Sequence, residues 1–174
     1  MAAGKDAGAM REIYDRYSGY LAAVCSRYIP DDGDMKDILQ DSFIKIYTSL
    51  DRFEYRGEGS LKAWMTRIVV NACLKSLRKR KGDPVPDNLP ETSGDDGEDP
   101  GFKDIPMPVI MEMIRKLPQG YRTVFNLFVF EDRSHKEIAS MLGIKENSSA
   151  SQFFRARAIL SKWITEYKKS HDNG

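Results

Sequence analysis

Apolar residues recur at three- and four-residue steps along most of the chain, which is the period of one face of an α-helix. The first such stretch covers residues 10–28 and ends before Pro30 and a cluster of aspartates. A second covers 35–50, with Ile46 on its apolar side. A third begins at Ser60, the predicted N-cap, ends at about Arg80 and has Trp64 in its predicted buried stripe. Between them, segment 51–59 combines aromatic residues, two glycines and mixed charge, which predicts a loop.

Residues 82–108 interrupt this period. Six prolines recur there among glycines and acidic residues, and bulky apolar residues are scarce. A segment of that composition buries too little apolar surface to offset the entropy of ordering it. We therefore predict a flexible linker over 82–108 that joins a first helical domain, residues 1–81, to a second, residues 109–174.

The second domain has the outline of a helix-turn-helix. Two short apolar stretches, 109–117 and 121–131, precede a capping-box pattern in which Ser134 and Glu137 satisfy each other's backbone donors. Gly143 then suits a helix C-cap, and a longer helix is predicted to start near Asn147 or Ser148. No alternating pattern of any length predicts a strand. The predicted fold class is all-α, with a three-helix or four-helix bundle followed by the helix-turn-helix domain.

Charge is unevenly distributed although 27 basic residues nearly balance 26 acidic ones. The stretch 67–81 holds six cations and no acid, and 82–104 holds eight carboxylates and one lysine. A basic helix beside an aromatic loop suits a phosphate backbone and unpaired bases. The alternative is that the last cations only complement a helix C-terminus.

The last predicted helix opens with short donors and guanidinium groups, which are the side chains that reach base edges and phosphates in a major groove. These residues are Ser148, Ser149, Ser151, Gln152, Arg155 and Arg157. An ordinary helical hairpin with a solvated face would have a similar sequence, so this pattern alone favours DNA binding without establishing it.

The sequence offers little for catalysis or metal binding. His135, expected to be a solvated first-turn residue, and His171 have no partner for acid–base or metal chemistry, and Cys25 and Cys73 form no metal-binding motif. We expect both cysteines to be reduced core residues and predict no cofactor, no metal and no enzymatic activity.

The longest apolar run is too short to span a membrane and no secretory signal is recognisable, so a cytoplasmic protein is expected.

Four blocks, taken together and in order, resemble the extracytoplasmic-function sigma factors of bacterial RNA polymerase, especially their Bacteroidetes members. The blocks are MKDILQDSFIKIYTSL at 35–50, GSLKAWMTRIVVNACLKSLRKR at 59–80, LPQGYRTVFNLFV at 117–129 and SHKEIASMLGIKENSSASQFFRARA at 134–158. The resemblance implies that the first domain is sigma region 2 and the second is region 4.

The resemblance also implies three binding surfaces. Core polymerase, through the clamp helices of its β′ subunit, would bind Asp37, Gln40 and Asp41. The minus-ten promoter element would bind Arg56, Ser60, Arg67, Asn71, Lys75, Arg78 and Lys79. The minus-thirty-five element would bind Ser149, Ser151, Gln152, Phe154, Arg155 and Arg157. A membrane-anchored anti-sigma protein would be the regulatory partner.

The start of the last predicted helix departs from the family pattern, because Asn147 and Ser148 stand where Gly-Thr is common and Ala150 stands where a basic residue is common. Ala150 therefore lacks the polar contact to phosphate or base that a basic residue would make there. The alternative function is a stand-alone helix-turn-helix regulator that binds duplex DNA as a dimer. Such a regulator would need a dimer interface or a ligand domain, and neither is evident in the sequence.

Overall fold

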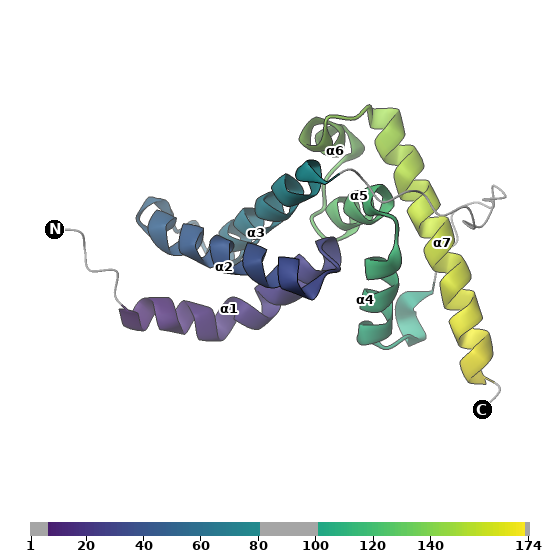
Figure 1. Ribbon diagram of the computed structural model, residues 1–174, viewed down its shortest axis with the longest axis horizontal. Helices are drawn as coiled ribbons and strands as arrows, with labels where there is room; N and C mark the ends of the chain where they lie inside the picture. The colour runs from purple at the N-terminus through teal and green to yellow at the C-terminus, as the bar shows by residue number, and fades with distance from the viewer. Residues whose placement is uncertain (1–6, 81–100, 173–174) are drawn as a thin grey trace. The chain divides into compact units, whose positions relative to one another are not determined.

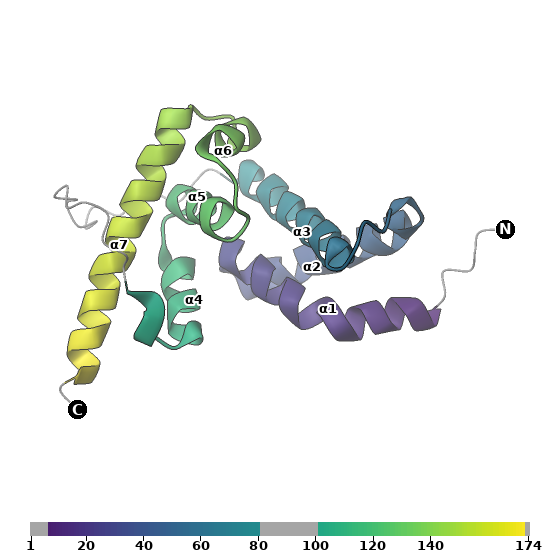
Figure 2. The ribbon, with the colours of Figure 1, turned by 180° about the vertical axis from the view of Figure 1, so that it is seen from behind.

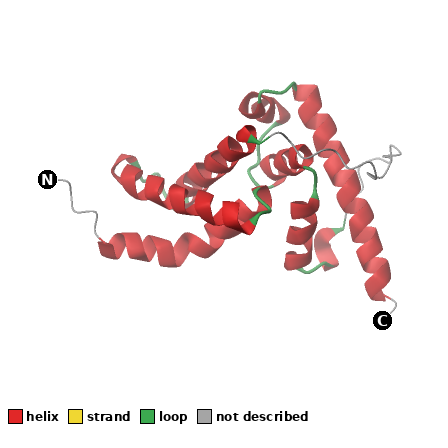
Figure 3. Ribbon diagram, viewed as in Figure 1, coloured by secondary structure: helices red, strands yellow, loops and turns green. Residues whose placement is uncertain are grey.

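The computed structural model describes residues 7–80 and 101–172, which form two compact units on either side of position 81. Within those residues every regular element is helical and there is no strand (Figure 3). The prediction of an all-α fold with two small helical domains is therefore confirmed. None of the described helices is long and apolar enough to cross a membrane.

The first unit is built from α1 (Ala7–Tyr28), α2 (Asp32–Ser49) and α3 (Ser60–Lys79), each of which contacts the other two (Figure 1). Figure 2 shows the same three helices side by side from behind. A short 3-10 helix, η1 (Leu50–Arg52), continues α2. The core is formed by side chains at helical spacing, including Leu21, Val24, Cys25, Tyr28, Ile46, Met65, Val69 and Cys73. Both cysteines are buried, as expected.

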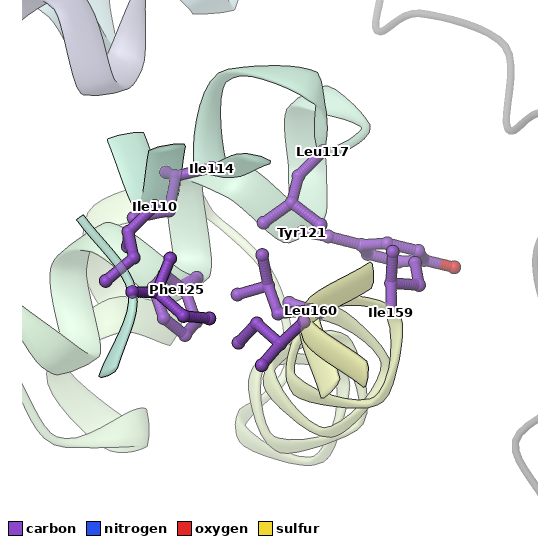
Figure 4. Packing of buried hydrophobic residues seen from close by; sticks show 10 residues of the cluster. Ile110, Ile114, Leu117, Tyr121, Phe125, Ile159 and Leu160 are labelled. Atoms are coloured by element: carbon purple, nitrogen blue, oxygen red, sulfur yellow. The ribbon is translucent and has the colours of Figure 1, made fainter. Parts of the chain in front are cut away.

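The second unit contains η2 (Phe102–Asp104), α4 (Met107–Lys116), α5 (Gln119–Val129), α6 (His135–Leu142) and α7 (Glu146–Asp172). The long α7 contacts α4, α5 and α6, so one helix supports the other three. Figure 4 shows Ile110, Ile114, Leu117, Tyr121 and Phe125 gathered in one cluster with Ile159 and Leu160 of α7. The middle of α7 is therefore attached to the core along one side.

The predicted linker is too long at its C-terminal end. Residues 101–108 belong to the second unit, because η2 and the first two residues of α4 lie within them and Ile105 is buried in one cluster with Ile110 and Ile114. The prediction failed because it used average composition. The segment contains one isoleucine that is buried, and one of its prolines lies in the first turn of a helix, where proline is well tolerated. The earlier part of the predicted linker, 82–100, lies outside the described residues.

Candidate nucleic-acid and polymerase interfaces

The outer side of α2 carries Asp37, Gln40 and Asp41, all exposed as predicted. The helix starts at an N-cap, Asp31, whose carboxylate accepts from the backbone N–H of Asp34 at 2.9 Å. From that start, Phe43 and Ile46 fall on the buried side. Gln40 and Asp41 follow Asp37 by three and four residues, so the three side chains share another, exposed side. The trio forms one solvent-facing surface, which we call the α2 face.

Ile44 extends the α2 face by one turn, and 55% of it is exposed. An aliphatic side chain in water beside charged groups is a typical centre for a protein contact. The sequence placed Ile46 on the apolar side correctly, and Ile44, four residues after Gln40, falls at the helical spacing of the exposed side.

The loop before α3 is held by Ser60. Its hydroxyl donates to the carbonyl of Gly57 at 2.7 Å and accepts from the backbone N–H of Arg56 at 3.2 Å. The N-cap of α3 is Gly59, with φ of 83°. The prediction of Ser60 as N-cap is therefore wrong, because its hydroxyl bonds backward into the loop and not forward into the helix.

A pocket of about 460 Å³ lies between this loop and the first turns of α3. Its lining comprises Arg52, Phe53, Glu54, Arg56, Ser60, Ala63, Trp64 and Arg67. The rings of Phe53 and Trp64 meet with their centroids 5.2 Å apart. Three cationic side chains and two aromatic rings thus converge on one hollow.

Three predicted minus-ten residues, Arg56, Ser60 and Arg67, line this pocket together. Sequence reasoning missed Trp64, which the helical period assigned to the buried stripe, and also Arg52 and Glu54. The period failed because Trp64 is only half-buried and reaches Phe53 across the loop. Aromatic residues in the loop were the one available signal.

A polar stripe continues from the pocket along α3. Asn71 and Lys75 follow Arg67 at four-residue steps, Arg78 comes next, and all four side chains are exposed together with Lys79. Arg80, just beyond the helix, forms an ion pair with Asp34 at the start of α2. The predicted minus-ten residues therefore form one continuous surface from the pocket to the C-terminal end of α3.

In the second unit the predicted turn and caps of the helix-turn-helix are confirmed. The Ser134 hydroxyl accepts from the Glu137 backbone N–H at 3.1 Å, and Glu137 accepts from the Ser134 backbone N–H at 3.2 Å. This backbone bond, with the Ser134 hydroxyl and Arg133, holds the pKa of the Glu137 carboxyl below its ordinary value. Gly143 caps α6 with φ of 67°, in the left-handed region.

The candidate recognition helix is the N-terminal part of α7, which begins at Glu146, slightly earlier than predicted. Ser151, Phe154 and Arg155 are exposed there, and Gln152 and Arg157 are half-buried. The Arg155 guanidinium donates to the Tyr121 hydroxyl at 3.4 Å. Gln152 lies so close to Gly120 that a Cβ there would come within 2.8 Å of its Oε1 atom.

Ser149 does not belong to the exposed set. It is fully buried, and its hydroxyl lies 2.9 Å from Nδ1 of His135 in a hydrogen bond between α7 and α6. The assignment of Ser149 to a DNA contact is therefore wrong, because its oxygen faces the interior of the helix-turn-helix.

The expectation that His135 is simply a solvated residue is also wrong. Its ring stacks on Phe128 with centroids 4.6 Å apart and planes 13° apart, and Phe153 of α7 lies beside it. His135 thus joins α5, α6 and α7. A histidine in a capping box gives no sequence signal of such a contact.

The residues that the structure describes contain no group of three or more His, Cys, Asp or Glu side chains placed to hold a metal ion. The candidate interfaces are instead composed of guanidinium, ammonium, amide and aromatic groups. These groups bind phosphates, base edges and base faces.

Comparisons with known proteins match both units. The family model described as "Sigma-70 region 2" matches residues 13–82, and "Sigma-70, region 4" matches residues 109–160. The ECF RNA polymerase sigma-E factor of Salmonella typhimurium is 30% identical over 91% of this chain and 88% of its own. The sigma-E factor of Escherichia coli K12 is 29% identical over the same shares.

A solved structure shares the fold. The sigma factor RpoE of Bartonella quintana, crystallised in complex with the anti-sigma factor NepR, matches 89% of this chain and 96% of its own with a TM-score of 0.53. The two sequences are 19% identical, so this likeness concerns the fold alone.

Proposed function

The chain belongs to the extracytoplasmic-function sigma factors of the sigma-70 family, and we propose that its two units divide promoter recognition between them. A factor of this family binds core RNA polymerase and directs transcription initiation at its promoters. The single observation that supports the division most is the match of region 2 and region 4, in that order, to the two units. The chain's role is to bind and position, and polymer synthesis belongs to the core enzyme.

The α2 face is the proposed contact with the clamp helices of the β′ subunit. Asp37, Gln40 and Asp41 are exposed together, and Ile44 adds an apolar group beside them. A charged rim around an apolar centre gives a contact both orientation and binding energy.

The pocket before α3 is the proposed receptor for an unpaired base of the minus-ten element. Phe53 and Trp64 provide aromatic surface, and Arg56 and Arg67 provide charge for the adjoining phosphates. The stripe of Asn71, Lys75, Arg78 and Lys79 would then follow the strand along α3.

The start of α7 is the proposed reader of the minus-thirty-five element. Ser151, Gln152, Phe154, Arg155 and Arg157 are its candidate contacts, and Ser149 is excluded because it is buried. Ala150 is exposed on the same segment and adds no polar group. The helix N-terminus is also suited to a phosphate.

We further propose that the chain acts in the cytoplasm, where core polymerase and promoter DNA are found, and that a membrane-anchored anti-sigma protein controls it. Family membership supports this partner. The Bartonella factor of similar fold was crystallised with an anti-sigma factor.

The decisive experiment is run-off transcription with purified chain and core polymerase on a library of promoter fragments. We expect discrete transcripts that appear only when the chain is added. Discrete binding of the chain alone to duplex DNA, with no transcript in the presence of core, would instead support the stand-alone regulator.

The pocket and stripe are tested by combining Arg67→Ala with Asn71→Ala. We expect promoter opening, measured by permanganate reactivity of minus-ten thymines, to fall by about 10-fold or more, since one lost contact costs roughly 1–3 kcal/mol. A pre-melted promoter should restore part of the loss. Arg11→Ala, an exposed cation on α1, is the matched control and should open the promoter normally.

A further inference from the structure

Two thiols meet in the core of the first unit. Cys25 on α1 and Cys73 on α3 are fully buried, and their Sγ atoms lie 3.5 Å apart. The fold alone brings them together, because 48 positions separate them in the sequence. Formation of a disulfide would need the sulfur atoms to approach by about 1.5 Å, since an S–S bond measures about 2.05 Å.

We propose that Cys25 and Cys73 form a thiol-oxidation site of the folded protein, at which a hydroperoxide converts the pair to a disulfide joining α1 to α3. Both cysteines are free in this structure. The site stands apart from the α2 face and from the pocket, and its oxidation does not depend on the proposed role in transcription.

The two sulfur atoms are chemically unequal. The hydrogen bond from the Cys73 thiol lowers the pKa of Cys25, and the same bond together with burial raises the pKa of Cys73. Cys25 is therefore the thiolate that reacts first, because the thiolate is the nucleophilic form of cysteine.

The reaction with hydrogen peroxide has two steps. The Cys25 thiolate attacks one peroxide oxygen, the O–O bond breaks, and a sulfenic acid and hydroxide form; the hydroxide becomes water with the proton that Cys25 lost. The Cys73 sulfur then attacks the Cys25 sulfur and the S–O bond breaks. Hydroxide leaves with the Cys73 proton as water. Two thiols and one hydrogen peroxide thus give one disulfide and two water molecules.

Burial decides which reagents and products are favoured. A reagent reaches the pair only through local opening of the helices, so a peroxide little larger than water should react where a bulky alkylating agent does not. Once the sulfenic acid forms, Cys73 already lies in contact with it. Disulfide formation should therefore outrun further oxidation to sulfinic acid.

The disulfide would enclose all of α2 and the loop that precedes α3 within one covalent ring. Such a ring restricts the unfolded chain more than the folded one, and it should raise the melting temperature of the first unit by about 5–15 °C.

The test treats the folded full chain with excess hydrogen peroxide, removes the peroxide, unfolds the protein in an alkylating agent and measures its mass. We expect a monomer with no alkylated cysteine, and after digestion one cross-linked pair of the Cys25 and Cys73 peptides, about 2 Da lighter than the two reduced peptides together, from which reduction restores both thiols. The melting temperature should rise only in the oxidised sample.

Cys25→Ala and Cys73→Ala are the matched controls, and neither should lose 2 Da or gain thermal stability with peroxide.

If either variant is unfolded, wild-type protein oxidised in urea serves as the control in its place. The intramolecular disulfide should then make up a larger share of the oxidised product in the folded sample than in the unfolded one, because the fold holds the two sulfur atoms together. Unmodified thiols in folded protein under peroxide that oxidises the unfolded chain would overturn the proposal. Sulfinic acid on one cysteine, or disulfides only between chains, would overturn it as well.

Discussion

The two units present their functional side chains in different ways. In the first unit, a loop and α3 surround a pocket, and the stripe beyond it uses positions about four residues apart. In the second, the candidate contacts come from neighbouring positions on α7. Residues three or four apart share a helical face, as exposed Ser151, Phe154 and Arg155 do, whereas Gln152 and Arg157 of the same set lie between faces and are half-buried.

In both units the residue next to an exposed contact can belong to the core, as buried Thr66 does next to Arg67. Arg67, Asn71 and Lys75 are exposed and can be changed with little cost to the core. On α7, exposed Arg155 is followed directly by buried Ala156, and exposed Ala150 follows buried Ser149. On α7, a substitution of an exposed residue therefore tests DNA binding, whereas a substitution of its buried neighbour tests the stability of the second unit.

The largest expected effect comes from the α2 face. Asp41→Arg combined with Gln40→Ala should abolish co-purification with core polymerase, because reversing a charge at a docking surface costs several kcal/mol. Both residues are exposed, so the variant's thermal melt should match that of wild type.

Asp15→Arg provides a charge-matched control, because Asp15 is exposed on α1 and lies outside the α2 face. It should co-purify with core polymerase as wild type does. Undiminished binding of the Asp41→Arg, Gln40→Ala variant would refute the interface, and a collapsed melt would mean that the two residues are structural.

On α7, Arg155→Ala with Phe154→Ala should reduce transcription from a promoter with a minus-thirty-five element by roughly 10- to 100-fold, at about 1–3 kcal/mol for the lost arginine contact. Binding to core polymerase should be unchanged, because the proposed contact with core polymerase, the α2 face, lies on the first unit. Lys162→Ala, an exposed cation further along the helix, is the control and should transcribe normally. If the Arg155→Ala, Phe154→Ala variant also transcribes normally, this helix does not recognise the minus-thirty-five element.

A pair of serines two positions apart sharpens the comparison within one helix. Ser149→Ala removes the hydrogen bond to His135 and should lower stability by about 1–2 kcal/mol, which corresponds to roughly 4–8 °C in melting temperature per kcal/mol. Ser151→Ala should leave the melt unchanged and weaken promoter binding, because Ser151 is exposed. Equal melts for the two variants would contradict the structural role of Ser149.

These cases also show what a sequence can predict here. The helical period placed Leu21, Ile46 and Ile159 in the core and Asp37 outside it, because burial on a helix repeats regularly. The period could not place Trp64 at the pocket or bring Cys25 to Cys73, since both depend on contacts between distant segments.

Family patterns had a different limit. They led to a surface role for Ser149, because a short hydroxyl side chain has the same identity whether it bonds to DNA or to a histidine inside the protein. The capping box was predictable because both of its partners lie within four residues.

The smallest expected effect concerns the start of α6, which carries the recognition helix. The pKa of Glu137 is lowered by its hydrogen bond from the Ser134 backbone, so the ionised carboxylate stabilises the folded state above its unfolded pKa. That contribution should be lost as pH falls through the lowered folded pKa. Glu137→Gln should remove this acid-dependent part of the stability, so the melting temperature of the variant should change less than that of wild type between neutral pH and the acid range.

Glu166→Gln, which removes an exposed carboxylate of α7, controls for the loss of one charge and should retain the wild-type acid response. A side-chain NMR titration that places the Glu137 pKa at or above its ordinary value would contradict the prediction.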